Sequence, residues 1–102
     1  MFIIELTYQT PLNEVDKFMQ AHREFLEYYY KQGLLLASGP IKPREGEIII
    51  ATTNDRAQLE TLLQQDPFTL AGISHYQITE FTPLRHRDEL KELIQKTEGK
   101  LC

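Results

Sequence analysis

The sequence predicts an α+β fold in which two helices pack on one face of a four-stranded antiparallel sheet. Four segments rich in strand-forming residues are separated by two segments whose apolar residues recur at helical spacing. Their order is strand, helix, strand, strand, helix, strand, which is that of the ferredoxin-like split βαβ arrangement. No linker or low-complexity tract interrupts the chain. We expect a single domain over residues 1–102, with a core at 1–84 and a helical tail at 85–102.

The first half of the chain contains two predicted strands and a long helix. Residues 2–8 (FIIELTY) nearly alternate apolar and polar side chains, which is typical of a strand. From about residue 11 to 32, apolar side chains recur every three or four positions, and Gly33 ends the helix. Residues 34–39 (LLLASG) form the second strand. The apolar stripe of the helix consists of Val15, Phe18, Met19, Phe25, Leu26 and Tyr29.

The middle of the chain predicts a hairpin followed by a second helix. Two prolines and a glycine within residues 40–46 are typical of a loop between hairpin strands, and residues 47–53 (EIIIATT) form the third strand. The second helix extends from residue 54 to about 65, with Leu59, Leu62 and Leu63 on its buried side. Asp66-Pro67 ends it, because the residue before a proline is displaced from helical geometry.

The remaining residues supply the last strand and the tail. After a short bend through Gly72, residues 73–82 (ISHYQITEFT) form the fourth strand. Residues 88–96 have the spacing of an amphipathic helix. This tail helix is an addition to the six-element core.

The uncovered face of the sheet predicts a partner subunit. Residues 34–37 (LLLA) and 47–50 (EIII) are continuous apolar runs, which indicate that both sheet faces are covered. Two helices cover only one face, so we expect a homodimer with the two sheets face to face, as in a dimeric α+β barrel. In an alternative arrangement, the terminal helix folds back over the open face. Its three apolar residues, Leu90, Leu93 and Ile94, are few for that purpose.

Composition and charge narrow the functional classes. The chain has 41% hydrophobic and 25% charged residues, which is ordinary for a globular protein. Its net charge of −4, with no cluster of basic residues, argues against a nucleic-acid partner. Its apolar runs are too short to span a membrane, and no signal sequence precedes the first strand, so we expect a cytoplasmic protein. The single cysteine, Cys102, cannot form an internal disulfide and is a poor candidate nucleophile.

Two polar residues mark a candidate site on the helix-covered face. His22 lies on the apolar stripe of the first helix, and Asp66 lies where the inner face of the second helix ends. Because both helices pack on one side of the sheet, the two side chains could meet. A histidine that donates to a carboxylate has a fixed tautomer and suits general base and acid catalysis. Ser38 and the backbone around Gly39 could donate hydrogen bonds to an oxyanion.

Each of these residues also has a structural interpretation. His22 could be a core histidine satisfied by one hydrogen bond, and Asp66 could bond its own backbone before the proline. His75 shares a strand face with Gln77 and Thr79, so it could join a pocket or lie in a dimer interface. A metal site made from His22, His75 and Asp66 is conceivable, but no short ligand motif supports it.

The charged hairpin loop offers one more possible contact. Lys42 and Arg44 could hold an anionic substrate at the entrance of a cavity, or they could simply be solvated. Arg85-His86-Arg87 is most simply a surface turn.

Four short motifs occur together in the order and spacing of a known family. They are AHREFL at 21–26, ASGP at 37–40, QDPF at 65–68 and ITEFTP at 78–83. Over residues 1 to 84 the chain resembles the YCII-related family of small bacterial proteins. The resemblance implies a ferredoxin-like domain in a dimeric α+β barrel, a cytoplasmic enzyme, and a His–Asp site on His22 and Asp66. It also implies kinship with muconolactone-isomerase-like proteins and with a dehydrochlorinase of chlorinated hydroxylated aromatics.

The first functional hypothesis is a homodimeric enzyme of isomerase, lyase or dehydrochlorinase type. His22, oriented by Asp66, moves a proton on a small cyclic or carbonyl-bearing substrate. Ser38, Gly39 and His75 are the expected substrate contacts. The scheme requires no cofactor and no metal.

The second hypothesis is a module without turnover, in which the same cavity binds a small ligand or stabilises the dimer. Access distinguishes the two hypotheses. A catalytic pair must line an open pocket, whereas a structural pair should be sealed among Phe25, Leu26 and Leu63.

Overall fold

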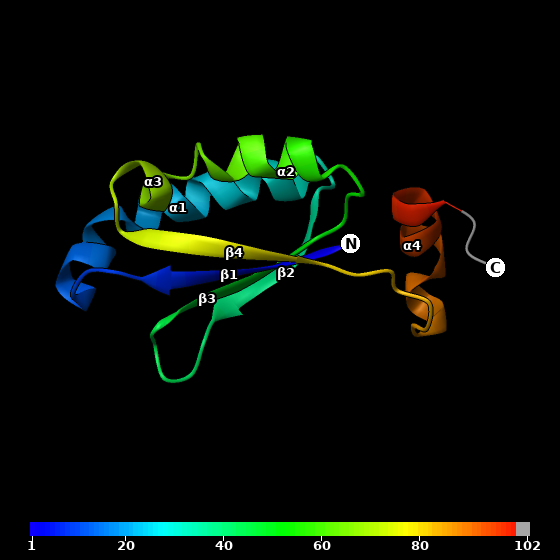
Figure 1. Cartoon of the computed structure of the whole chain (residues 1–102), viewed down its shortest axis with the longest axis horizontal. Helices are drawn as coiled ribbons and strands as arrows, with labels where there is room; N and C mark the ends of the chain where they lie inside the picture. The colour runs from blue at the N-terminus through cyan, green and yellow to red at the C-terminus, as the bar shows by residue number, and fades with distance from the viewer. Residues whose placement is uncertain (100–102) are drawn as a thin grey trace.

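The computed structural model describes residues 1–99 and contains one four-stranded antiparallel sheet (Figure 1). The strand order is β2-β3-β1-β4, with every neighbouring pair antiparallel. The predicted fold class and element order are confirmed, and no predicted strand end is wrong by more than two residues. The strands are β1 (Phe2–Tyr8), β2 (Leu35–Pro40), β3 (Gly46–Ala51) and β4 (Ser74–Glu80).

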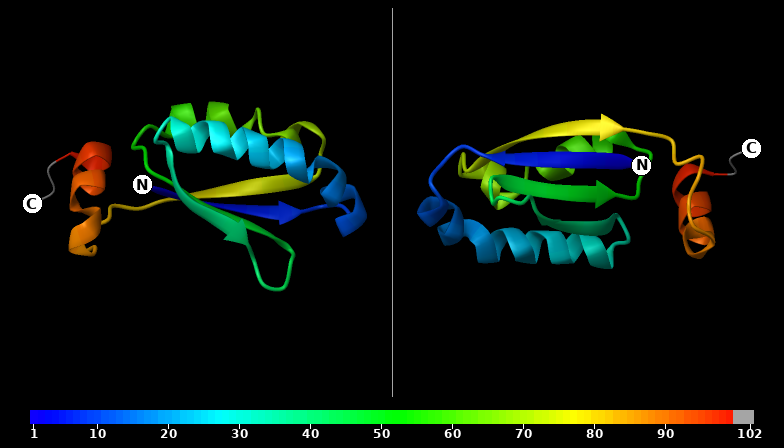
Figure 2. Two further views of the ribbon diagram at one scale, coloured as in Figure 1. Left: turned by 180° about the vertical axis from the view of Figure 1, so that it is seen from behind. Right: turned by 90° about the horizontal axis from the view of Figure 1, so that it is seen from below.

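Three helices cover the same face of this sheet (Figures 1 and 2). They are α1 (Leu12–Lys31), α2 (Arg56–Leu63) and α3 (Pro67–Leu70). The bend predicted after Asp66 is in fact the four-residue helix α3. The Asp66 side chain caps it by accepting a hydrogen bond from the backbone N–H of Phe68, and proline suits its first position because no N–H is needed there.

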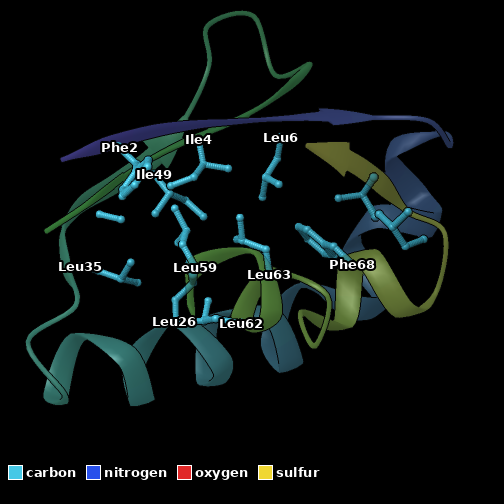
Figure 3. Close-up of a cluster of buried hydrophobic side chains, with 13 residues drawn as sticks. Phe2, Ile4, Leu6, Leu26, Leu35, Ile49, Leu59, Leu62, Leu63 and Phe68 are labelled. Carbon is cyan, nitrogen blue, oxygen red and sulfur yellow. The ribbon is translucent and has the colours of Figure 1, made fainter. Parts of the chain in front are cut away.

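The core lies between the sheet and these helices (Figure 3). Strand β1 is central, and its residues alternate between the two faces: Phe2, Ile4 and Leu6 are fully buried under the helices, whereas Ile3 and Glu5 are exposed. The predicted inner face of α2 is confirmed, because Leu59, Leu62 and Leu63 are all buried. On α1 the buried residues are Val15, His22 and Leu26.

The tail lies beyond one end of the sheet instead of over its open face (Figures 1 and 2). It contains a 3-10 turn η1 (Asp88–Leu90) and helix α4 (Lys91–Glu98), close to the predicted residue range of 88–96. Thr97 on α4 donates a hydrogen bond to the carbonyl of Thr52, next to β3, and Ile94 is buried. The alternative in which this helix folds back over the sheet is therefore wrong. Cys102 lies outside the described residues.

The open face of the sheet keeps an apolar centre. Ile3 pairs with Ile50, and Ile50 also pairs with Ala37, so these side chains share the face away from the helices. Ile48 lies beside them, and a shallow pocket of about 260 Å³ extends over β2 and β3. Among the described residues, no helix has the length and apolarity required to cross a membrane.

Candidate active site

A cavity of about 570 Å³ lies among α1, the end of β1, strand β2, the hairpin loop and the start of β3. Its walls carry polar side chains of several chemical types. His22, Arg23 and Asp16 come from α1, Tyr8 from β1, Ser38 from β2, Arg44 from the loop, and Glu47 from β3. Polar groups therefore converge on one cavity next to the core, and such convergence is a feature of small-molecule sites.

His22 is the centre of a buried polar cluster. Its ring is only 1% exposed, because it lies on the face of α1 that packs toward the sheet. Nδ1 lies 2.8 Å from Oδ1 of Asp66, and Nε2 lies 2.9 Å from Oε2 of Glu47. The ring also stacks on Phe68, with centroids 4.0 Å apart and planes 7° from parallel. The expected proximity of His22 and Asp66 is thus present, with an additional carboxylate on the other side of the ring.

Asp66 has both of the roles that its position allows. Its Oδ1 accepts one hydrogen bond from the Phe68 N–H, at 2.9 Å, and another from His22. The residue is fully buried, and its second oxygen, Oδ2, has no hydrogen-bond partner among the described residues. The short helix α3 fixes this carboxylate, so Asp66 anchors the imidazole from the sealed end of the cluster.

Glu47 is the site residue that the sequence analysis missed. It pairs with Leu6 of β1 and therefore points, like Leu6, toward the helices. Its side chain is 9% exposed and lines the cavity, so it forms the open end of the cluster. The available signal was the alternation of β3: Glu47 shares a face with the buried residues Ile49 and Ala51, and a carboxylate at an inward position needs a partner.

The two carboxylates determine the charge of His22. Burial opposes protonation and by itself would lower the pKa of the ring. The hydrogen bonds to Asp66 and Glu47, together with their negative charges, outweigh this effect and raise the pKa of His22 to about 9. At neutral pH the ring is therefore an imidazolium whose two N–H groups donate to the two carboxylates.

The remaining predicted contacts divide into two groups. Ser38 and Gly39 line the cavity, and the Ser38 hydroxyl lies 2.6 Å from the hydroxyl of Tyr30. His75 is not brought to the cavity. It pairs with Thr7, so strand alternation places it on the open sheet face, where it is exposed and lies 3.3 Å from the amide oxygen of Gln9.

The exposed fraction increases along the cluster from Asp66 through His22 to Glu47. Asp66 is 0% exposed, His22 is 1% exposed and the Glu47 side chain is 9% exposed. The histidine is thus sealed on its Asp66 side, whereas the carboxylate on its other side meets the cavity. Within residues 1–99, no three His, Cys, Asp or Glu side chains are arranged to hold a metal ion, and both nitrogens of His22 already bond to carboxylates.

Several chains of known structure have a similar fold. One of them is the 5-chloro-2-hydroxyhydroquinone dehydrochlorinase of Burkholderia phenoliruptrix, in complex with 2,5-dihydroxybenzoquinone. The superposition has a TM-score of 0.67 and 19% sequence identity, and it covers 87% of this chain and 98% of that chain. At this identity the likeness establishes the fold. No protein of curated function is significantly similar to the chain.

The sequence itself matches a family model. The model of the YCII-related domain matches residues 1–82, which include α1, β3, α3 and therefore the whole His22 cluster. The resemblance inferred from the four motifs is confirmed. The chain belongs to the YCII-related family.

Proposed function

We propose that this protein is an enzyme that catalyses general acid/base proton transfer on a small cyclic or carbonyl-bearing molecule bound in the 570 Å³ cavity. The observation that carries the proposal is the hydrogen-bonded series from Asp66 through His22 to Glu47. The series begins at a sealed carboxylate and ends at one that lines a cavity. A structural cluster needs no open end, whereas a proton-transfer site does.

The geometry supports a different division of roles from the one expected for a His–Asp pair. His22 is charged at neutral pH and both its N–H groups donate, so it cannot accept a proton in this state. Glu47 is the member that meets the cavity, and its Oε1 makes no hydrogen bond to the described residues. We assign Glu47 as the proton acceptor, His22 as the cation that positions it, and Asp66 as the anchor of the ring.

The proposed step transfers one proton to Glu47 from an acidic C–H or O–H group of the substrate. The electron pair of that bond stays on the substrate as an enolate or a related anion. In an isomerase, the Glu47 carboxyl group returns the proton to another atom of the same molecule. In a dehydrochlorinase, the anion expels chloride and the proton leaves to solvent.

The solved relative supports the substrate class. Its name describes removal of chloride from a chlorinated hydroxyhydroquinone, and its structure contains a small dihydroxylated quinone. A molecule of that size fits the volume of the present cavity, whose lining includes the apolar residues Met19 and Leu26 beside its polar groups.

We further propose a cytoplasmic homodimer in which the open sheet faces pack together. On that face Ile3 is exposed and Ile48 and Ile50 are half-buried, and α4 lies elsewhere. A second copy would bury this surface and protect the exposed sheet.

A deuterium-exchange assay tests the role of Glu47 and does not require the reaction product to be identified. Candidate hydroxyquinones and cyclic ketones are incubated with the protein in D2O, and loss of the C–H signal is followed by NMR. For a compound that exchanges, Glu47→Gln should lower the rate by at least about 100-fold, the usual contribution of a positioned base. Glu45→Gln is the matched control, because Glu45 lies in the adjacent loop, is exposed and does not line the cavity.

Two results would contradict the proposal. Full exchange activity in Glu47→Gln would remove Glu47 from the reaction. Tight ligand binding without exchange in any compound of the class would instead support a binding module without turnover.

A further inference from the structure

An ion pair connects the hairpin loop to α1 at the exposed side of the cavity. Nη2 of Arg44 lies 2.5 Å from Oδ1 of Asp16, and both residues line the cavity. Their side chains are 37% and 57% exposed, whereas the side chain of Glu47 is 9% exposed. The cavity therefore extends from an exposed ion pair to a buried carboxylate, and the ion pair is part of its exposed side.

Tyr8 lines the same cavity, and the charges of Glu47 and Arg44 both act on its phenol. Burial raises the pKa of its phenol, the charge of Glu47 raises it further, and the nearby positive charge of Arg44 acts in the opposite direction. The phenol consequently stays protonated at neutral pH and can donate a hydrogen bond. One cavity thus contains an acceptor at Glu47, a neutral donor at Tyr8 and a guanidinium at Arg44.

We propose that Arg44, assisted by Tyr8, is the anion-binding element of this cavity and exchanges Asp16 for an anionic oxygen of the substrate. The ligand class is a small organic molecule with a carboxylate, enolate or phenolate oxygen. The further statement that this molecule presents its acidic hydrogen to Glu47 rests on the proposed function.

Three physical considerations support the exchange. A guanidinium offers a planar set of donors that matches an oxyanion, and such charge-assisted hydrogen bonds are strong. The existing bond to Asp16 is exposed, and exposed ion pairs contribute little, so breaking it costs little. An anion placed near Glu47 without a cation would be repelled, so a charged substrate beside this base requires a cation in the cavity, and Arg44 lines it.

The same loop and helix provide controls for the assignment. Lys42 has the same charge on the same loop, but it is not among the residues that line the cavity. Arg23 on α1 lines the cavity as well, and it makes no ion pair with the described residues. Each of the three cations is replaced in turn, and anion affinity is compared. A loss confined to the Arg44 variant indicates a specific contact, whereas similar losses in all three indicate a general positive potential.

The test is isothermal titration with 2,5-dihydroxybenzoquinone, whose acidic hydroxyls make it anionic, and with its neutral dimethoxy analogue. Benzoate provides a carboxylate for comparison. Arg44→Gln should weaken binding of the anions by about 10- to 100-fold, whereas Lys42→Gln should leave it within about twofold. Binding of the neutral analogue should not change in Arg44→Gln. The anion that loses more affinity identifies the oxygen type that Arg44 recognises.

Asp16→Asn gives a result that a structural role for the ion pair would not give. Removal of the competing carboxylate should strengthen anion binding by roughly two- to fivefold. In the double variant Arg44→Gln/Asp16→Asn this gain should vanish. If Asp16 only braced the loop, its replacement would weaken binding instead, and that result would overturn the exchange.

The remaining outcomes also decide the question. The proposal fails if wild-type protein binds none of the anions at millimolar concentration, if Arg44→Gln retains full affinity, or if Arg23→Gln causes the same loss as Arg44→Gln. Glu47→Gln separates this proposal from the proposed function. It should retain or increase anion affinity while proton exchange is lost, so an error about Glu47 leaves the assignment of Arg44 intact.

Discussion

The high pKa of His22 predicts that this protein loses stability as the pH rises through mildly alkaline values. The ring has a pKa of about 9 in the folded chain, compared with 6.5 for an unperturbed histidine. Each tenfold difference in proton affinity is worth about 1.4 kcal/mol, so protonation of His22 favours the folded state by about 3 kcal/mol. The ring is 1% exposed, and water therefore screens these interactions little.

The direction of the effect follows from proton binding. Between pH 6.5 and about 9, the folded chain keeps a proton on His22 that the unfolded chain has already released. The stabilisation is therefore complete below pH 6.5 and disappears as the pH rises through 9. Over that interval the free energy of unfolding should fall by about 1.4 kcal/mol per pH unit.

Urea unfolding at a series of pH values and constant protein concentration measures this slope. His22→Gln is the comparison, because groups distant from His22 titrate equally in both proteins and cancel in the difference. The reasoning is refuted if the two slopes are the same. NMR titration of the wild-type ring provides a second measurement that does not depend on the stability of the variant. The pKa of His22 should decrease in Asp66→Asn, where one of the two negative charges is lost.

Two further predictions concern the sheet. Gly46→Ala should destabilise the protein by roughly 3 kcal/mol in urea unfolding, because an added Cβ would lie 1.9 Å from the backbone oxygen of Leu6. Gly39→Ala should have little effect, since its Cβ would meet nothing within 4 Å, and equal losses would contradict this explanation. Ile50→Lys should convert the proposed dimer to a folded monomer in light scattering, while Gln20→Lys on the exposed side of α1 should not. A dimer that survives Ile50→Lys would place the interface elsewhere.

The parts of the fold that the sequence predicted are those with strong periodicity. The 3.6-residue stripe of α1 located His22 on its inner face, and the same spacing on α2 led to Asp66. Helix α3 was missed because four residues are too few to show a period, and only the Asp-Pro pair marked it. The residues of the tail helix were predicted, but its place beyond one end of the sheet was not. Periodicity identifies which side of a helix is buried and does not identify the element that covers it.

The errors at the site have a related cause. Glu47 precedes three isoleucines, and the run was interpreted as apolar on both faces, which hid the fact that a carboxylate points inward. His75 was predicted as a substrate contact because histidine can exchange protons. Its pairing with Thr7 places it on the open sheet face instead. A strand pattern determines which residues share a face. It does not determine which face the helices cover, and for that the register with β1 was required.

The arrangement of the cluster predicts that Asp66 contributes mainly to the stability of the fold and Glu47 mainly to proton exchange. Asp66 is sealed, and its Oδ1 serves both His22 and the α3 N–H, so Asp66→Asn should cost roughly 2 to 3 kcal/mol of unfolding free energy. Glu47 borders the cavity, where water can replace a lost contact, so Glu47→Gln should cost only about 1 kcal/mol. If the proposed function is correct, proton exchange should show the reverse order, because of these two residues only Glu47 lines the cavity. The comparison requires urea unfolding and deuterium exchange on the same two variants. Equal effects of the two substitutions on both properties would mean that the cluster acts as a structural unit, and the asymmetry in exposure would then have no functional meaning.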